Sequence, residues 1–244
     1  MSGPLRAQIG AELRILRRNG EQLLLTIVIP IIVIVFFGLT DVLPSGLPDH
    51  MDFLTPGVLA LAIMSSAMVS LGIATGFERG YKVLRRLGVT PLGRPRWLAA
   101  KTITILVVEL VQVAVLVPVA IALDWSPGGA RWPLALGAVG VGSVAFAGLG
   151  LTIAGRLRAE INLAAQNGLY IVLLLLGGMI VPFDKLPGGL ETVAKYLPSG
   201  ALADVLRESL VGSGAGTQPG TSWIVLGAWA VGAPIVAALT FRWE

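Results

Sequence analysis

The sequence predicts an all-α integral membrane protein, and three observations lead to this fold class. Apolar residues make up 55% of the 244 residues, whereas charged residues make up only 13%; in an ordinary soluble domain about a quarter of the residues are charged. The mean hydropathy is high, at +0.83. The apolar residues also gather in runs of about 20, the length at which a helix crosses the hydrocarbon core of a bilayer.

Six such runs follow one another along the chain, and we expect each to form a membrane-spanning helix. They are residues 23–39, 54–76, 98–123, 134–154, 163–181 and 223–241. The first run follows a polar segment of about 22 residues with six charges, which is longer than the short basic start of a cleavable signal peptide. The first span is therefore expected to be retained, and residues 1–244 are expected to form one transmembrane domain.

The basic residues predict the orientation of the spans. With the N-terminus in the cytoplasm, fourteen of the eighteen Lys and Arg residues fall in cytoplasmic segments and four in outer segments. Loops rich in Lys and Arg stay on the cytoplasmic side. We expect a multi-pass protein of the inner (plasma) membrane with both termini in the cytoplasm. The net charge of +4 then reflects topology, and no nucleic-acid partner is expected.

The segment before the first span, residues 1–22, has the periodicity of an amphipathic helix. Its apolar residues at helical spacing are Leu5, Ile9, Leu13 and Leu16, and most of its arginines lie off that face. This pattern is typical of a helix that lies in the headgroup layer of a membrane.

The outer segment after the fifth span, residues 182–222, predicts a helical hairpin followed by a loop. Leu190, Val193, Ala194 and Leu197 repeat at helical spacing, and Pro198 separates them from a second short helix over residues 201–210. Residues 211–222 are rich in Gly, Ser and Thr and are expected to form a loop into the sixth span.

The cytoplasmic segment between the second and third spans, residues 77–97, is strongly basic. A helix over residues 77–87 would place apolar side chains on one face and basic side chains on another. The apolar face would hold Phe77, Tyr81 and Leu84, and the basic face Arg79, Lys82 and Arg86. Two interpretations remain open, because this pattern fits both a docking site for a soluble partner and a solvated loop that only orients the protein. Lys101 follows near the inner boundary, where its side chain could snorkel to the headgroups.

The same segment resembles the permease subunits of type-2 ABC exporters. Members of that family carry a Glu-Arg pair, then Gly-Thr-Leu, then Thr-Pro-Leu and a basic residue at this position. The matching residues of this chain are Glu78-Arg79, Leu84, Leu87, Thr90-Pro91-Leu92 and Arg94, whereas Lys82-Val83 stands where the family has Gly-Thr. A second resemblance, to the outer helical hairpin of the family, rests on Pro182, Leu186-Pro187, Tyr196-Leu197-Pro198 and Leu206-Arg207.

The resemblance implies a half-channel that moves a hydrophobic or amphipathic substrate outward, such as a drug, a lipid or a glycan precursor. It implies a separate ABC ATPase subunit that binds ATP and Mg, and this chain itself has no phosphate-binding loop and no cofactor of its own. It also implies a second permease subunit, identical or paralogous, with the substrate path between the two. By position, the residues that couple to the ATPase would be Phe77, Glu78, Arg79, Tyr81, Lys82, Leu84, Arg86 and Leu87.

Polar residues inside the predicted spans are candidates for the substrate path. These candidates are Ser65, Ser66, Ser70, Gln166 and Asn167, with Asn162 beside them. Such side chains also bond neighbouring helices or their own backbone. Glu109, with Gln112 three residues on, is the ionisable residue deepest in an apolar run, so it is expected to face protein or water. It is either a contact for substrate or protons, or a buried hydrogen bond that holds the third span.

Other classes of function have little support in the sequence. The chain has no cysteine and a single histidine, His50, which disfavours redox chemistry and nucleophilic cysteine catalysis. Asp41, Asp49 and Asp52 lie near His50, but their Pro-rich context favours a solvated loop over a metal site. We expect no enzyme and no metal site. A membrane scaffold subunit that transports nothing remains an alternative.

Overall fold

The computed structural model describes residues 3–18, 20–40, 50–88, 92–212 and 219–242, and describes only the backbone of residues 20–25, 88, 94 and 219. Within these residues every regular element is helical. The elements are α1 (Gly3–Arg18), α2 (Gly20–Gly38), α3 (His50–Met64), the π-helix η1 (Ser65–Ser70), α4 (Leu71–Gly80), α5 (Val83–Gly88), α6 (Gly93–Ala122), α7 (Trp132–Ala154), α8 (Ala159–Leu176), the short 3-10 helix η2 (Phe183–Lys185), α9 (Leu190–Tyr196), α10 (Pro198–Leu210) and α11 (Pro219–Thr240). The all-α prediction is confirmed.

Five of the six predicted spans are found as helices that are long and apolar enough to cross a membrane. They are His50–Gly80, Pro95–Ala122, Trp132–Ala154, Ala159–Leu176 and Gly220–Thr240. The predicted first span coincides with α2, where the apolar helix Thr26–Gly38 falls short of that length among the residues with described side chains. Six spans are therefore not established.

The fifth span differs in its bounds from the prediction, because α8 begins at Ala159 and ends at Leu176. Gly177 follows, and Gly178 adopts a positive φ of 60°, a conformation that ends a helix and that glycine adopts without steric cost. The apolar residues up to Val181 thus belong to a turn. Length of apolar sequence alone could not reveal this boundary.

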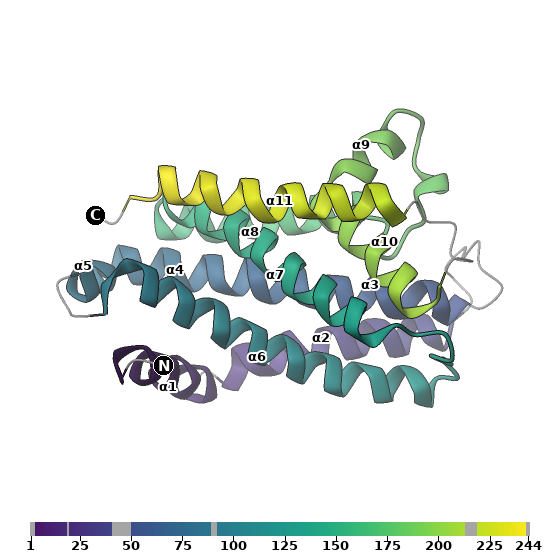
Figure 1. The fold of residues 1–244 in the computed structure, drawn as a ribbon, viewed down its shortest axis with the longest axis horizontal. Helices are drawn as coiled ribbons and strands as arrows, with labels where there is room; N and C mark the ends of the chain where they lie inside the picture. The colour runs from purple at the N-terminus through teal and green to yellow at the C-terminus, as the bar shows by residue number, and fades with distance from the viewer. Residues whose placement is uncertain (1–2, 19, 41–49, 89–91, 213–218, 243–244) are drawn as a thin grey trace.

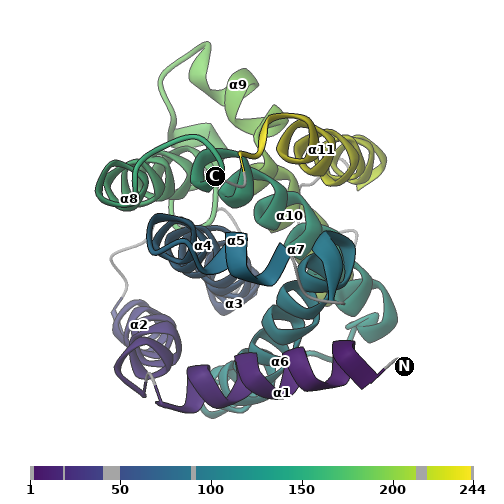
Figure 2. The same cartoon turned by 90° about the vertical axis from the view of Figure 1, so that its left-hand side faces the viewer.

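The continuous helix made by α3, η1 and α4 is the centre of the bundle. Thirteen of the fifteen residues of α3 are buried, and Figure 2 shows α2, α6, α7, α8 and α10 arranged around this central helix. At η1 the wider π turn lies against α7, where a Cβ on Gly150 would be 2.6 Å from the carbonyl oxygen of Met68. The glycine therefore permits close packing of two spans.

The two ends of the bundle differ. Figure 1 shows α5, α1 and the C-terminal end of α11 at one end, and α9 and α10 at the other. α1 lies across the bundle against α6 and α2 (Figure 2), with its four predicted apolar residues half-buried and Arg6, Arg14, Arg17 and Arg18 exposed. α1 thus has the apolar face that the sequence predicts, and its place in the headgroup layer stays a prediction. The two helices of the predicted hairpin are described as α9 and α10, with Pro198 at the start of α10. Their place on the outer side stays a prediction.

Some expectations fall outside the described residues. Asp41, Asp49, Thr90 and Pro91 are among these, as is most of the predicted loop over residues 211–222.

Candidate functional site

The segment at the end of the helix His50–Gly80, predicted to be cytoplasmic, belongs to two helices, which corrects the prediction of one helix over residues 77–87. α4 ends at Gly80, and α5 begins at Val83. Between them Lys82 has a φ of 59°, the left-handed conformation that stops a helix. The family that this segment resembles has glycine at the position of Lys82. Glycine adopts a positive φ without steric cost, so the backbone conformation found at Lys82 is one that suits glycine.

The break changes which residues share a face. The rings of Phe77 and Tyr81 stack with their centroids 6.1 Å apart, but Leu84 turns into the core and is 1% exposed. Tyr81, Lys82 and Arg86 are exposed, whereas Leu87 is half-buried. The surface of this segment therefore combines one aromatic ring with basic side chains.

Arg79 turns away from that surface and binds the turn between α7 and α8. Its Nη1 donates a hydrogen bond of 2.6 Å to the carbonyl oxygen of Gly155, and its Nη2 donates to the carbonyl oxygen of Leu157. The backbone N–H of Arg242 donates to the same Gly155 oxygen at 3.1 Å. Arg79 thus joins the end of α4 to the α7–α8 turn, and Gly155 of that turn also binds the residue that follows the end of α11 by two positions. The predicted basic face does not form at this position.

Glu78 also turns inward, where it forms an ion cluster with Lys101 and Glu12. Nζ of Lys101 lies 2.9 Å from Oε2 of Glu12 and also donates to Oε1 of Glu78. Lys101 is only 5% exposed. The expectation that Lys101 snorkels to the headgroups is wrong, because two carboxylates from other helices pair with its ammonium group inside the protein. The cluster connects α1, α4 and α6.

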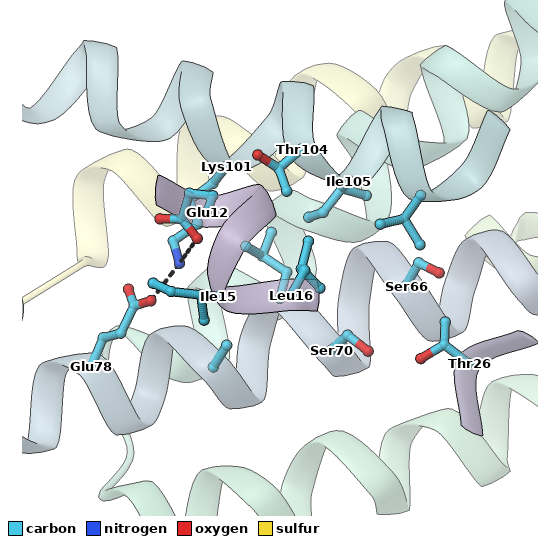
Figure 3. A pocket seen from close by; sticks show the side chains of 13 residues that line it. Glu12, Ile15, Leu16, Thr26, Ser66, Ser70, Glu78, Lys101, Thr104 and Ile105 are labelled. Atoms are coloured by element: carbon cyan, nitrogen blue, oxygen red, sulfur yellow. Dashed lines mark hydrogen bonds and ion pairs between the residues drawn. The ribbon is translucent and has the colours of Figure 1, made fainter. Parts of the chain in front are cut away.

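This ion cluster forms one end of a cavity of about 90 Å³ between α1, the central helix and α6. Figure 3 shows Glu12, Glu78 and Lys101 at one end of this α1–α6 cavity, and Ser66 and Thr26 at the other. Ser70 and Thr104 lie on its wall, together with apolar side chains of α1 and α6 such as Leu16 and Ile105. The cavity is therefore charged at one end, lined by hydroxyl groups along its length, and otherwise apolar.

Two of the candidate path residues line this cavity, namely Ser66 and Ser70. Ser66 donates a hydrogen bond of 2.9 Å to Oε1 of Gln112. Ser65 is half-buried on the same π-helix but is not a lining residue of the cavity. The lining role of Ser66 and Ser70 in transport stays a prediction.

The candidates on α8 lie elsewhere. Gln166 is fully buried, and its amide nitrogen donates to the carbonyl oxygen of Gly150 at 2.8 Å. Asn162, one turn earlier, donates to the carbonyl oxygen of Gly72 at 3.0 Å. Both amides therefore fasten α8 to its neighbours, as the alternative interpretation expected. Asn167 is exposed and bonds Leu163 of its own helix, so it faces away from this bundle.

Glu109 and Gln112 share α6 but contact different neighbours. Glu109 is fully buried and accepts a hydrogen bond from the hydroxyl of Ser143 on α7. Gln112 accepts from Ser66 and donates to the carbonyl oxygen of Thr26 at 2.9 Å. These contacts support the interpretation in which Glu109 holds the third span in place. They do not bring Glu109 and Gln112 into one polar site.

A second buried ion pair lies at the opposite end, in α10, outside the candidate spans. Arg207 Nη1 is 3.3 Å from Oδ1 of Asp204, and the guanidinium group lies 4.1 Å from the centre of the Phe53 ring. Arg207 also donates to the carbonyl oxygen of Gly178. Burial raises the pKa of Asp204 and lowers the pKa of Arg207, and the attraction between the two charges opposes both shifts. The pair fixes α10 against the turn after α8.

Sequence reasoning missed three members of the cavity, Glu12, Thr104 and Lys101. Glu12 had a signal, because it is an acidic residue within the otherwise basic polar face of an amphipathic helix. Lys101 also had one, since it follows Trp97 by four residues on α6, and its Nζ lies 5.7 Å from the centre of that ring. Thr104 had none, because a single threonine in an apolar span is ordinary.

In the part of the chain that the structure describes, no group of three His, Asp or Glu side chains is placed to hold a metal ion.

Comparison with known proteins agrees with the geometry. The chain is 27% identical over 199 residues to a protein of Bacillus subtilis (strain 168) named "Putative transport permease YvfS", and the match covers 80% of each chain. The family model described as "ABC-2 type transporter" matches residues 5–211. That match includes nearly all of α1, the α4–α5 break, the α1–α6 cavity and the hairpin of α9 and α10. The chain is a multi-pass membrane protein that belongs to the ABC-2 type transporter family.

Proposed function

We propose that this chain is the membrane subunit of an ABC exporter, driven by a separate ABC ATPase subunit that binds ATP and Mg. The substrate is hydrophobic or amphipathic, such as a drug, a lipid or a glycan precursor, and moves outward across the inner (plasma) membrane. Both termini lie in the cytoplasm. Family membership supports a transporter subunit; the ATPase, the substrate class and the direction are the proposal.

The observation that carries the proposal is the way in which α5 is joined to the bundle. α5 presents Arg85 and Arg86 to solvent, and Tyr81 beside it is 72% exposed. Directly before it, Glu78 pairs with Lys101 of α6, which also pairs with Glu12 of α1, and Arg79 contacts the turn between α7 and α8. A push on α5 would therefore act on four other helices at once. An exposed basic surface with rigid internal connections is what transmission of force from a soluble partner requires.

The exposed apolar faces of α2 and α8 support a second permease subunit. Ile32 and Phe36 on α2 are 58% and 55% exposed, and Ile171 and Leu175 on α8 are 53% and 56% exposed. In Figure 2 these two helices lie on the same side of the bundle and flank α4. We propose that a second copy, or a paralogue, faces this side, with the path between the subunits. Asn167, exposed on α8, would then face the path.

Co-expression with the neighbouring reading frame, which we expect to encode the ABC ATPase, tests the proposal. We expect a stable complex that hydrolyses ATP, and we expect Arg86→Glu to lower its turnover, because reversed charge on α5 opposes docking. Lys185→Glu is the matched control, since Lys185 is exposed at the opposite end. Failure to recover an ATPase, or equal turnover in both variants and the wild type, would overturn the proposal.

A further inference from the structure

We propose that the α1–α6 cavity binds the cationic head of an amphipathic substrate, with its apolar chain along α6. This inference rests on the proposed function and narrows its substrate class to amphipathic cations. It is argued from the charges, the unpartnered oxygens and the shape of the cavity.

The charges at the end of the cavity do not cancel. Two carboxylates, Glu12 and Glu78, meet one ammonium group, Lys101. The arginines of α1 are exposed and, among the residues that the structure describes, form no ion pair with the cluster, and Arg79 is hydrogen-bonded to the α7–α8 turn. With all three groups ionised, the cluster holds one negative charge in excess. In a site that is largely shielded from water, an excess charge attracts a cation more strongly than it would at the surface.

The hydrogen bonds show which atom is available to that cation. Glu12 uses both carboxylate oxygens, since Oε1 accepts from Gln8 at 2.8 Å and Oε2 from Lys101. Glu78 uses only one. Its Oε2 is buried and, among the described residues, has no hydrogen-bond partner. A buried carboxylate oxygen without a donor is costly, and an ammonium head would supply that donor.

A second unpartnered oxygen lines the same cavity. Thr104 is 3% exposed, and within the described part of the chain its Oγ1 makes no hydrogen bond. Ser70 continues the row of hydroxyl groups toward Ser66 (Figure 3). A head with more than one N–H donor could therefore bond Glu78 and still find acceptors along the wall.

The remaining wall suits an apolar chain. It is lined by Ile15 and Leu16 of α1 and by Ile105 and Val108 of α6. Ile15 lies outside the predicted apolar face of α1 and is 53% exposed, and its place at the cavity accounts for an apolar residue there. The π-helix η1 forms part of the wall through Ser66 and Ser70, and such helices are frequent at functional sites.

The test uses three photoactivatable probes with the same octyl chain and diazirine, ending in an ammonium, a hydroxyl or a carboxylate group. The full chain is held in nanodiscs of phosphatidylcholine, and labelled peptides of α1 and α6 are measured by mass spectrometry. We expect the ammonium probe to label them about tenfold more than the hydroxyl probe, the effect of one charge-assisted hydrogen bond. Equal labelling by the three probes, or more labelling by the carboxylate, would overturn the inference.

Charge variants make the test specific. Glu78→Gln removes the excess charge and should reduce ammonium labelling to the level of the hydroxyl probe. Lys101→Gln leaves two carboxylates and should increase it; if that variant does not fold, Glu12→Gln should decrease labelling as Glu78→Gln does. Glu160→Gln, on the exposed face of α8, should leave it unchanged. Variants that do not follow this order contradict the inference.

The labelling does not need the ATPase, so the two proposals can fail separately. If the ATPase is recovered and the ammonium probe shows no preference, only the substrate class is wrong. If no ATPase is recovered, the exporter assignment is wrong, and the labelling then decides only whether the cavity binds amphipathic cations.

Discussion

The guanidinium group of Arg79 and the carbonyl oxygen of Gly155 are joined by a hydrogen bond of 2.6 Å, although 76 residues separate them in sequence. The same guanidinium binds Leu157 through its second nitrogen, and the same carbonyl accepts the N–H of Arg242. Because the planar guanidinium holds two donors in a fixed fork, Arg79 sets the distance between the end of α4 and the α7–α8 turn.

Arg79→Lys should therefore weaken the connection although it keeps the charge. A lysine ammonium is a point donor on a flexible stem and cannot replace both nitrogens of the fork. We expect the free energy of unfolding to fall by about 2 kcal/mol, the cost of hydrogen bonds from a charged donor. The thermal unfolding midpoint in detergent measures this change. Arg85→Lys, on the exposed side of α5, is the control and should leave the midpoint unchanged; an equal midpoint for Arg79→Lys would show that the fork is dispensable.

Gly76→Ala should destabilise the contact between α4 and α8. A Cβ at this position would lie 2.3 Å from Nδ2 of Asn162, and such overpacking costs about 1–3 kcal/mol. Gly137→Ala is the matched control, because a Cβ there would meet nothing within 4 Å. That change should be neutral or stabilising by up to about 1 kcal/mol, since alanine favours a helix.

A double-mutant cycle locates the effect. In the background of Asn162→Ala, the nearest remaining atom to the new Cβ is the Cβ of residue 162, at 3.5 Å. Gly76→Ala should then cost much less than in the wild type, and the difference in thermal midpoints gives the coupling. Equal costs in both backgrounds would mean that Asn162 is not the residue that the glycine accommodates.

Much of the fold could be predicted from the sequence, because apolar length and basic loops reflect the bilayer directly. The spans from the second to the sixth, the amphipathic α1 and the hairpin of α9 and α10 were all found near their predicted places. The helix bounds were harder. The end of α8 and the break at Lys82 depend on positive φ angles, and a non-glycine residue such as Lys82 gives no local sign of one.

The candidate site could be predicted only in part, because partners across the bundle are not visible in one sequence. The position of Glu78 and Arg79 in the sequence predicts that they lie on a docking surface. The structure pairs them instead with Lys101 of α6 and with Gly155 in the α7–α8 turn. In the sequence, Gln166 is a polar residue in an apolar run whether it lines a path or binds the carbonyl oxygen of Gly150. Tertiary contacts decide between such roles, and helical periodicity does not contain them.

Ser143→Ala should show that Glu109 is held by a hydrogen bond. The change leaves a fully buried carboxyl group without its donor, and an unsatisfied buried group costs about 1–3 kcal/mol. Glu109→Gln keeps an oxygen that can accept from Ser143, so we expect it to assemble normally and to unfold near the wild-type midpoint. If Ser143→Ala unfolds at the wild-type midpoint, the hydrogen bond does not hold α6 to α7, and the transport role of Glu109 becomes the better interpretation.

Arg207→Gln should strongly destabilise the hairpin of α9 and α10, because it leaves Asp204 buried without its cation. Removing one partner of a buried ion pair costs about 3–5 kcal/mol. Adding Asp204→Asn should recover part of this loss, since no buried charge then remains. Arg131→Gln is the control: Arg131 is 50% exposed in its pair with Glu208 at 3.2 Å, and such a pair contributes about 0–1 kcal/mol.

The pH dependence of Arg207→Gln gives a second, independent measurement of the same pair. Burial raises the pKa of Asp204, and the Arg207 charge opposes that rise. Without Arg207 the folded-state pKa rises further above the unfolded value, so the folded variant binds a proton that the unfolded chain releases. Its stability should therefore increase as the pH falls from neutral through the folded-state pKa, and its deficit against the wild type should shrink. A deficit that is constant between neutral and mildly acidic pH would show that Asp204 does not depend on Arg207 for its charge.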